Sequence, residues 1–245
     1  MKINEYNIGN EKKILCLPGL YMNGECFEGL SKELREYHMI CITYDSFHYG
    51  TEEFESLEDQ SDKIVALLKE KGWTDFVLTI GTSLGTVFAS HLAATSDLSL
   101  GKLWLDGGVM LFPYKAKFFY SMAIYSIFHQ IMVETKKGSL DVKFLGSPMP
   151  KEWLRRTKEP RSAMSEQALK NVTHVLVNYQ MEEGIGLPIY MTFGEKEGNI
   201  RPNVRYVKSL YPNTIATVEK GYQHLEFMDA KPAEYAARVR WFIKK

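Results

Sequence analysis

The sequence predicts an α/β protein with a mainly parallel central sheet and helices on both of its faces. Short apolar runs of strand length alternate along the chain with segments whose apolar residues recur at helical spacing. Such alternation requires right-handed crossovers between parallel strands, and these crossovers place helices on both faces of the sheet. The polar turns of the chain also follow predicted strands. In an open parallel sheet such turns share one edge, where ligand sites form beyond the carboxyl ends of the strands.

The predicted strands are short apolar runs, and the first of them has the weakest signal. They cover residues 2–8, 13–17, 38–44, 76–80, 102–105, 189–193 and 214–218. The predicted helices carry apolar residues at helical spacing and cover 27–37, 56–71, 83–93, 112–132, 165–181, 204–210 and 231–245. The segment 112–181 contains no strand of good quality, so we expect it to be helical.

The composition is that of an ordinary globular protein. The 245 residues are 45% apolar and 24% charged, which is enough to bury a core. Lys and Arg number 30, as do Asp and Glu, so charge gives no reason to expect nucleic acid or an anionic membrane as a partner. Three cysteines argue against a disulfide framework and fit a reducing compartment.

Two further features favour a cytoplasmic protein. The first eleven residues are polar with mixed charge, unlike a signal peptide. The longest apolar stretch, 118–133, is interrupted by polar residues and is too short to span a bilayer. We therefore expect a cytoplasmic protein without a membrane partner.

Residues 81–85 form a glycine-x-serine-x-glycine turn between a predicted strand and a predicted helix. A strand that reverses into a helix within one residue strains that residue, and a Cβ at Gly81 or Gly85 would collide with the strand or the helix. Ser83 would stand at the helix N-terminus, where free N–H groups favour a developing negative charge. The structural alternative is a small-residue turn with a capping serine. We predict that Ser83 is a nucleophile.

A serine nucleophile needs a base, and His224 is the predicted one. Of the six histidines, it alone follows a C-terminal strand within a short loop. His91 lies two turns into the helix that begins after Ser83, and we predict a packed helix residue there. The base in turn needs an orienting acid.

At this point the chain resembles the α/β-hydrolase family, in which the order serine, acid, histidine is expected. The turn 194–198 is similar to the family's glycine-x-x-aspartate turn, with Glu197 at the aspartate position. Glutamate is one methylene longer than aspartate, so Glu195 and Asp106 are kept as alternatives for the acid. The resemblance implies the α/β-hydrolase fold and Ser–His–acid chemistry without a cofactor.

The resemblance also implies an oxyanion hole made of two backbone N–H groups. One belongs to Leu84, directly after the nucleophile. The other belongs to Leu20, by analogy with the family's histidine-glycine-x turn. Pro18 stands where that turn has histidine, but the donor is a backbone group and does not require it.

The family commonly carries a helical lid between the strands at 102–105 and 189–193. We therefore expect a hydrolase core formed by residues 1–110 and 187–245 and a lid formed by residues 111–186. The aromatic and methionine-rich helix of the lid is interpreted either as a pocket roof or as packing against outer helices. The pocket residues expected on the first interpretation are Tyr21, Phe118, Met122 and Tyr125.

The sequence thus predicts a serine hydrolase, a carboxylic-ester hydrolase acting on a small or medium apolar acyl substrate. The alternatives are a C–C bond or amide hydrolase with the same triad, and a non-catalytic small-molecule-binding protein of this fold. Metal-ligand spacings and phosphate-cradling glycine loops are missing from the sequence, so we expect no metal and no nucleotide cofactor. The oligomeric state is left open.

Overall fold

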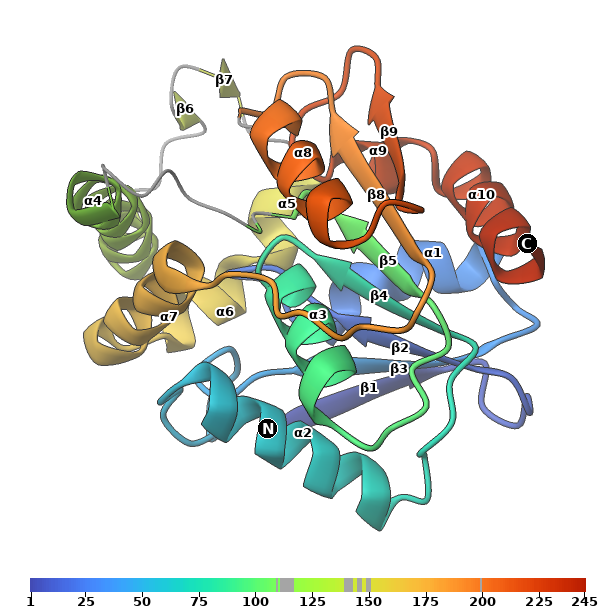
Figure 1. Cartoon of the computed structure of the whole chain (residues 1–245). Helices are drawn as coiled ribbons and strands as arrows, with labels where there is room; N and C mark the ends of the chain where they lie inside the picture. Colours follow the sequence, from blue (N-terminus) through green and yellow to red (C-terminus); the bar gives the residue numbers. More distant parts are fainter. Residues whose placement is uncertain (109, 111–116, 139–142, 145–146, 149–150, 199) are drawn as a thin grey trace.

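The structure, a computed structural model, describes residues 1–108, 110, 117–138, 143, 144, 147, 148, 151–198 and 200–245 (Figure 1). Its centre is a seven-stranded sheet with the order β1-β3-β2-β4-β5-β8-β9. The edge strand β1 pairs antiparallel with β3, and the other pairs of this sheet are parallel. Its strands are β1 (Lys2–Tyr6), β2 (Lys13–Leu17), β3 (His38–Thr43), β4 (Leu78–Thr82), β5 (Leu103–Asp106), β8 (Ile189–Gly194) and β9 (Ile215–Glu219). The predicted α/β class is confirmed.

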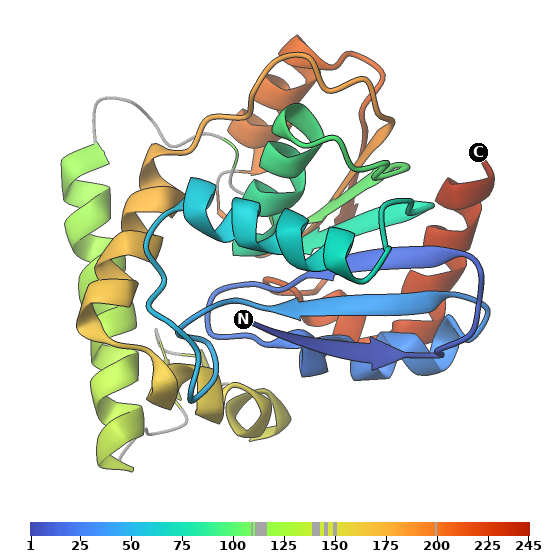
Figure 2. The same cartoon turned by 90° about the horizontal axis from the view of Figure 1, so that it is seen from below.

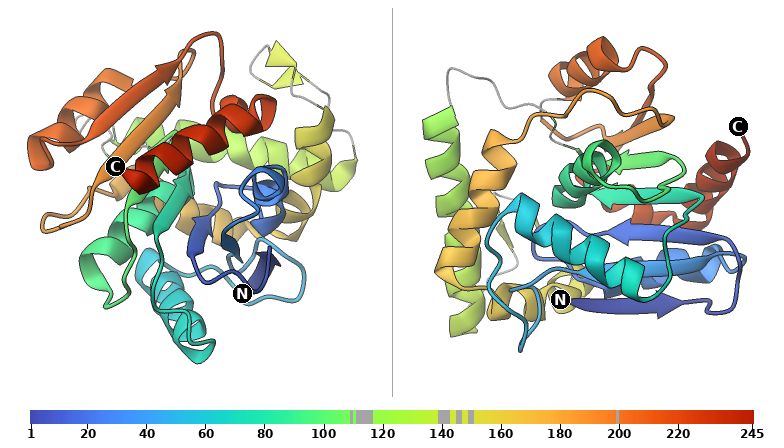
Figure 3. Two further views of the ribbon diagram at one scale, coloured as in Figure 1. Left: turned by 90° about the vertical axis from the view of Figure 1, so that its right-hand side faces the viewer. Right: turned by 60° about the horizontal axis from the view of Figure 1, so that its bottom comes forward.

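Helices cover both faces of the sheet because successive strand residues face opposite sides. On β2, Leu15 belongs to one apolar cluster and Cys16 to the other. The first cluster includes residues of α2 (Leu57–Glu70), α3 (Leu84–Thr95) and α8 (Ile200–Leu210). The second includes residues of α1 (Glu28–Glu33), α9 (Glu226–Ala230) and α10 (Pro232–Lys244), and α10 crosses this face in the left view of Figure 3.

A mostly helical segment is inserted between β5 and β8. It comprises α4 (Lys117–Lys137), β6 (Lys143–Phe144), β7 (Ser147–Pro148), α5 (Lys151–Arg156), α6 (Lys158–Ala163) and α7 (Glu166–Asn178). α4 packs against α6 and α7, and Figure 2 shows α4 and α7 side by side beyond one end of the sheet. The expectation that the segment contains no strand is wrong for β6 and β7, which pair antiparallel. Two-residue strands are too short to show a period in the sequence.

Several other elements also differ from the sequence prediction. β4 is Leu78–Thr82, two residues later than predicted, because the sheet continues directly up to the turn. The predicted helix 27–37 is replaced by a 3₁₀ turn, η1 (Gly24–Phe27), followed by the short α1. The later apolar residues of that segment, Leu34 and Tyr37, are buried in a non-helical turn in which Tyr37 N–H donates to Leu34 O (3.1 Å). α9 was not predicted, since five residues give little helical periodicity.

Among the described ranges, no helix combines the length and the apolar character needed to cross a membrane.

Candidate active site

Ser83 occupies the one-residue turn between β4 and α3. Its backbone has φ 50° and ψ −114°, which is unusual for a residue with a side chain. Three hydrogen bonds hold this conformation. The Ser83 amide donates to the carbonyl of Asp106 (2.8 Å), and the amide and hydroxyl of Thr86 donate to the Ser83 carbonyl (3.0 and 2.6 Å). The strain is thus maintained by the neighbouring strand β5 and by the first turn of α3.

The glycines around Ser83 are required by close approaches of the backbone. A Cβ at Gly81 would lie 2.4 Å from the Gly85 carbonyl oxygen, and one at Gly85 would lie 1.9 Å from the Leu17 carbonyl oxygen. These clashes confirm the steric reason predicted for the two glycines. Gly19 is also close, since a Cβ there would lie 3.0 Å from the Cβ of Ser83. The turn after β2 therefore lies directly against Ser83.

His224 and Glu197 form a hydrogen-bonded pair. Nδ1 of His224 donates to Oε2 of Glu197 at 2.8 Å, and the other carboxylate oxygen of Glu197 accepts from the Gly194 amide at 2.6 Å. The Glu197 side chain is 8% exposed, whereas that of His224 is 47% exposed. The carboxylate is therefore fixed by the backbone and fixes the imidazole, which leaves the other side of the ring accessible.

Gly107 links the histidine to the serine, and its role was not predicted. It has φ +63°, and a Cβ there would lie 2.5 Å from Cε1 of His224. The imidazole therefore packs against the backbone of Gly107. The preceding residue, Asp106, accepts the hydrogen bond from the Ser83 amide through its carbonyl. No hydrogen bond joins Ser83 to His224 within the described residues, but catalytic hydrogen bonds are often long before substrate binds. The glycine after the β5 strand was visible in the sequence, but its contact with His224 requires the fold.

The other two candidates for the acid have different partners. Glu195 accepts from the amide of Gly221 (2.9 Å). Asp106 accepts from the hydroxyl of Tyr235 (3.0 Å) and is 4% exposed. Of the three, Glu197 is the one that reaches His224.

The carboxyl groups and the imidazole influence one another's ionisation. Burial, followed by the negative charge of Glu197, raises the pKa of Asp106 to about 7, although the Tyr235 hydrogen bond opposes the shift. Burial lowers the pKa of His224, but the hydrogen bond and charge of Glu197 and the charge of Asp106 outweigh it, so the pKa lies above its ordinary value of 6.5. The imidazole of His224 is therefore protonated over a wider pH range than that of a free histidine.

The two backbone N–H groups predicted to bind an oxyanion belong to segments next to Ser83. Leu84 begins α3, and Leu20 follows Gly19, whose backbone approaches Ser83. Neither N–H has a hydrogen-bond acceptor among the described residues. Both donors are therefore available to a bound group.

The four predicted pocket residues differ in their surroundings. Tyr21 is 1% exposed, and its hydroxyl donates to the carbonyl of Phe128 in α4 (2.7 Å). Tyr125 is half-buried and stacks on the ring of His129, while Met122 is 55% exposed. The side chain of Phe118 lies outside the described part of the structure. Their role in a pocket stays a prediction.

Another histidine–carboxylate pair, one of several in the described structure, involves His91. Nδ1 of His91, on α3, is 2.7 Å from Oε1 of Glu182, whose other oxygen accepts from the hydroxyl of Tyr179 (2.6 Å). Both acidic and aromatic partners lie just after α7. The pair therefore connects α3 to the segment that leads into β8, which agrees with the predicted packing role of His91.

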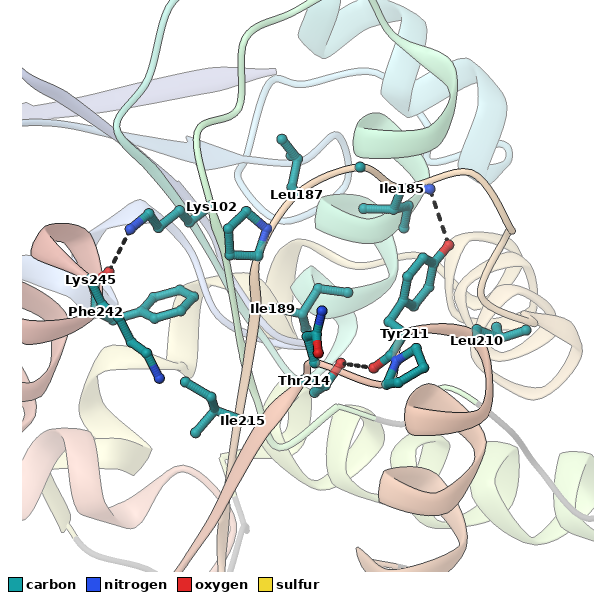
Figure 4. Close-up of a pocket in the computed structure, with 14 residues that line it drawn as sticks. Lys102, Ile185, Leu187, Ile189, Leu210, Tyr211, Thr214, Ile215, Phe242 and Lys245 are labelled. Atoms are coloured by element: carbon teal, nitrogen blue, oxygen red, sulfur yellow. Dashed lines mark hydrogen bonds between the residues drawn. The ribbon is translucent and has the colours of Figure 1, made fainter.

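A pocket of about 670 Å³ lies at the amino-terminal ends of β8 and β9 (Figure 4). Its wall includes Ile189 and Ile215, the first residues of β8 and β9, whereas Ser83 follows the last residue of β4. Some polar groups in its wall are hydrogen-bonded to one another. The hydroxyl of Tyr211 accepts from the amide of Ile185 (3.1 Å), and its carbonyl accepts from the hydroxyl of Thr214 (2.8 Å). This pocket is separate from the Ser83 site.

In the part of the chain that the structure describes, no group of three or more His, Cys, Asp or Glu side chains is arranged to hold a metal ion.

Neither a protein-family model nor a curated protein matches the sequence. Solved structures, however, match its fold over nearly the whole chain. MenH from S. aureus has a TM-score of 0.78 at 13% identity and covers 99% of this chain and 97% of its own. An α/β-hydrolase family protein from Desulfitobacterium hafniense has a TM-score of 0.77 at 14% identity, covering 99% of this chain and 100% of its own. The esterase EaEST from Exiguobacterium antarcticum has a TM-score of 0.75 at 17% identity, covering 99% and 95%. The chain therefore has the α/β-hydrolase fold.

Proposed function

We propose that this protein is a serine hydrolase that cleaves carboxylic esters with a small or medium apolar acyl group. The observation that carries the proposal is the His224–Glu197 pair, 2.8 Å apart, seated on Gly107 next to the strained Ser83. A serine in a strand-to-helix turn, a histidine and a carboxylate that orients it are the three parts of the acyl-transfer triad.

In the proposed reaction, Ser83 Oγ attacks the ester carbonyl carbon while Nε2 of His224 accepts the hydroxyl proton. The N–H groups of Leu20 and Leu84 stabilise the oxyanion of the tetrahedral intermediate. Collapse of the intermediate expels the alcohol, which takes the proton from His224, and leaves an acyl-serine. Water then attacks the acyl-serine with His224 again as base, which releases the acid and regenerates Ser83. Glu197 holds the imidazole in the required tautomer and stabilises its charged form.

The names of similar folds are consistent with this proposal. EaEST is named an esterase, and a structure of the same fold from Thermogutta terrifontis is named a thermophilic esterase (TM-score 0.75, 14% identity). At such identities the likeness concerns the fold, so the ester specificity proposed for this chain depends on its own residues. We further propose that the substrate is a small cytoplasmic molecule and not a macromolecule.

The test is covalent labelling with a fluorophosphonate, followed by peptide mapping and an ester panel. We expect labelling of wild type at Ser83 and none in Ser83→Ala or His224→Ala. Turnover should fall by roughly 10⁶-fold in either variant, as when the serine or histidine of a triad is removed. His91→Ala is the matched control and should retain labelling. A folded wild type that is not labelled would contradict the proposal.

A non-catalytic binding function is the second candidate, because Ser83 and His224 are not hydrogen-bonded to each other in the described structure. In that case Ser83→Ala would leave the affinity for a ligand nearly unchanged, and no ester would be turned over. If labelling succeeds but esters are not cleaved, amide and C–C substrates are next, since the same residues serve those reactions.

A further inference from the structure

Like the turn at Ser83, the turn that carries Leu20 contains a strained residue, Tyr21. Met22 N–H donates to the Gly19 carbonyl (3.1 Å), which closes a four-residue turn with Leu20 and Tyr21 at its centre. Tyr21 has φ +60°. The third position of a turn with φ above zero is normally glycine or asparagine, because a larger side chain is disfavoured there. Something outside the turn must therefore hold Tyr21 in place.

The external support comes from the inserted helix α4. The Tyr21 hydroxyl donates to the backbone carbonyl of Phe128 at 2.7 Å, across 107 residues of sequence. The two rings meet edge to face, with centroids 5.8 Å apart and an interplanar angle of 76°. Tyr21 is 1% exposed and Phe128 is half-buried, so the donor side of the hydrogen bond is buried. A buried hydrogen bond of this kind is lost only at a substantial cost, because its donor would be left unsatisfied.

We propose that Tyr21 is a positioning residue that makes the placement of the Leu20 N–H depend on α4. This inference rests on the proposed function, in which that N–H binds the oxyanion. Leu20 and Tyr21 are the two central residues of one tight turn. Rotation of Tyr21 out of its left-handed conformation therefore reorients the peptide groups next to it. The inserted segment then completes the active site through the oxyanion turn, and not only by covering it.

The ionisation of Tyr21 is compatible with this role. Burial raises the pKa of its hydroxyl, against the opposing charge of Arg161, so the group stays a neutral donor over the working pH range. The Phe128 carbonyl is an acceptor at every pH. The hydrogen bond between Tyr21 and Phe128, which we call the tether, is therefore kept over the working pH range.

The test compares Tyr21→Phe with Tyr44→Phe. Tyr44 is a buried tyrosine of the same apolar cluster, is stacked on Phe88 (centroids 4.5 Å apart), and has a hydroxyl with no hydrogen-bond partner in the described structure. Each substitution removes one buried hydroxyl, but only Tyr21→Phe removes the hydrogen bond to the carbonyl of Phe128. We expect Tyr21→Phe to lower kcat and kcat/KM together by about 10- to 100-fold with KM nearly unchanged, since a misplacement of about 1 Å can cost about 10²-fold and an oxyanion contact acts in the transition state. Tyr44→Phe should retain the wild-type kcat.

Hydrogen exchange provides a readout that does not need activity. Amides in residues 18–24 and in residues 124–134 should both exchange faster in Tyr21→Phe and not in Tyr44→Phe. Wild-type kcat in Tyr21→Phe, or faster exchange in residues 124–134 alone, would overturn the inference. Failure of the proposed function is a separate result, namely a wild type that neither reacts with the fluorophosphonate nor turns over esters. In that case coupled exchange in the two segments would still support the tether, and its absence would refute it.

Discussion

Among the histidine–carboxylate pairs of the described residues, those of His224 and His91 have nearly identical local geometry, yet we assign catalysis to only one of these two. Nδ1 of His224 lies 2.8 Å from Glu197, and Nδ1 of His91 lies 2.7 Å from Glu182. Distance therefore does not distinguish the pairs. Their place in the fold does.

The first pair stands at the carboxyl edge of the sheet. His224 is 47% exposed, and it rests on Gly107 beside the turn that carries Ser83. The second pair lies along α3, where the His91 side chain is 13% exposed and Glu182 also binds Tyr179. A histidine that is to move protons needs one free, accessible nitrogen beside the reacting group, whereas a structural histidine can use its ring for packing.

The largest difference between the pairs should follow from neutralising each carboxylate. Glu197→Gln is expected to reduce kcat by about 10⁴-fold, as when the triad carboxylate is replaced by its amide, because the imidazole loses its tautomer and its partner charge. Glu182→Gln should leave kcat within about twofold and lower stability by about 1 kcal/mol through a weakened hydrogen bond. Steady-state kinetics and urea unfolding of both variants make the comparison.

The reverse pattern would exchange the two assignments. A Glu182→Gln protein that is folded but inactive, beside an active Glu197→Gln protein, would mean that the His91 pair is the functional one. Equal activity in both would mean that neither carboxylate takes part in the chemistry.

A smaller effect is expected from the glycine under His224. Gly107 and Gly72 both have positive φ, +63° and +70°, but a Cβ at Gly72 would meet nothing within 4 Å. Alanine should therefore destabilise both proteins by about 1–2 kcal/mol through backbone strain. Only Gly107→Ala should also displace the imidazole, and we expect its kcat to fall by about 10²-fold, the loss typical of a misplacement near 1 Å. Thermal unfolding and kinetics of the two variants separate strain from displacement, and a fully active Gly107→Ala protein would show that the ring does not depend on this contact.

The turn that carries Ser83 was predictable from the sequence because its constraints are local. Gly81 and Gly85 are needed by backbone atoms a few residues away or on the adjacent strand, and Ser83 is strained by the reversal itself. The alternation of strands and helices is likewise a local pattern, and it gave the sheet and its two helical faces. What it did not give was the exact start of β4, since Phe76 and Val77 are as apolar as the strand that follows them.

Contacts between distant segments were beyond the sequence. Glu195, Glu197 and Asp106 were all chemically suitable acids, and the structure separates them by the partners it brings to each. The roles of Gly107 and Tyr21 depend on residues more than one hundred positions away, His224 for the first and Phe128 for the second. Periodicity carries no information about such pairs.

We expect the smallest effect on catalysis from the substitution Asp106→Asn. The buried Asp106 carboxyl is close enough to His224 for its charge to affect the pKa of the imidazole. The charge of Asp106 helps to raise the pKa of His224 above 6.5, so its removal should lower that pKa. Because the base must be neutral, the acidic limb of kcat/KM should move to lower pH in Asp106→Asn while the plateau changes little. Tyr235→Phe removes the hydroxyl bound to Asp106 but keeps the carboxyl, so it is the matched control for the lost hydrogen bond.

The same substitution should change how stability depends on pH. The pKa of Asp106 is about 7 in the folded protein and 3.8 as its ordinary value, so folding takes up a proton between these pH values. The stability of wild type should therefore be largest, as far as this group is concerned, below about pH 4 and fall as pH rises through 7. The full change amounts to roughly 4 kcal/mol, at about 1.4 kcal/mol for each pKa unit. Asp106→Asn should remove this component, which urea unfolding at pH 5 and pH 8 measures. An unchanged pH dependence of stability would mean that the pKa of Asp106 is not raised in the folded protein. An unmoved acidic limb would mean that the charge of Asp106 does not influence His224.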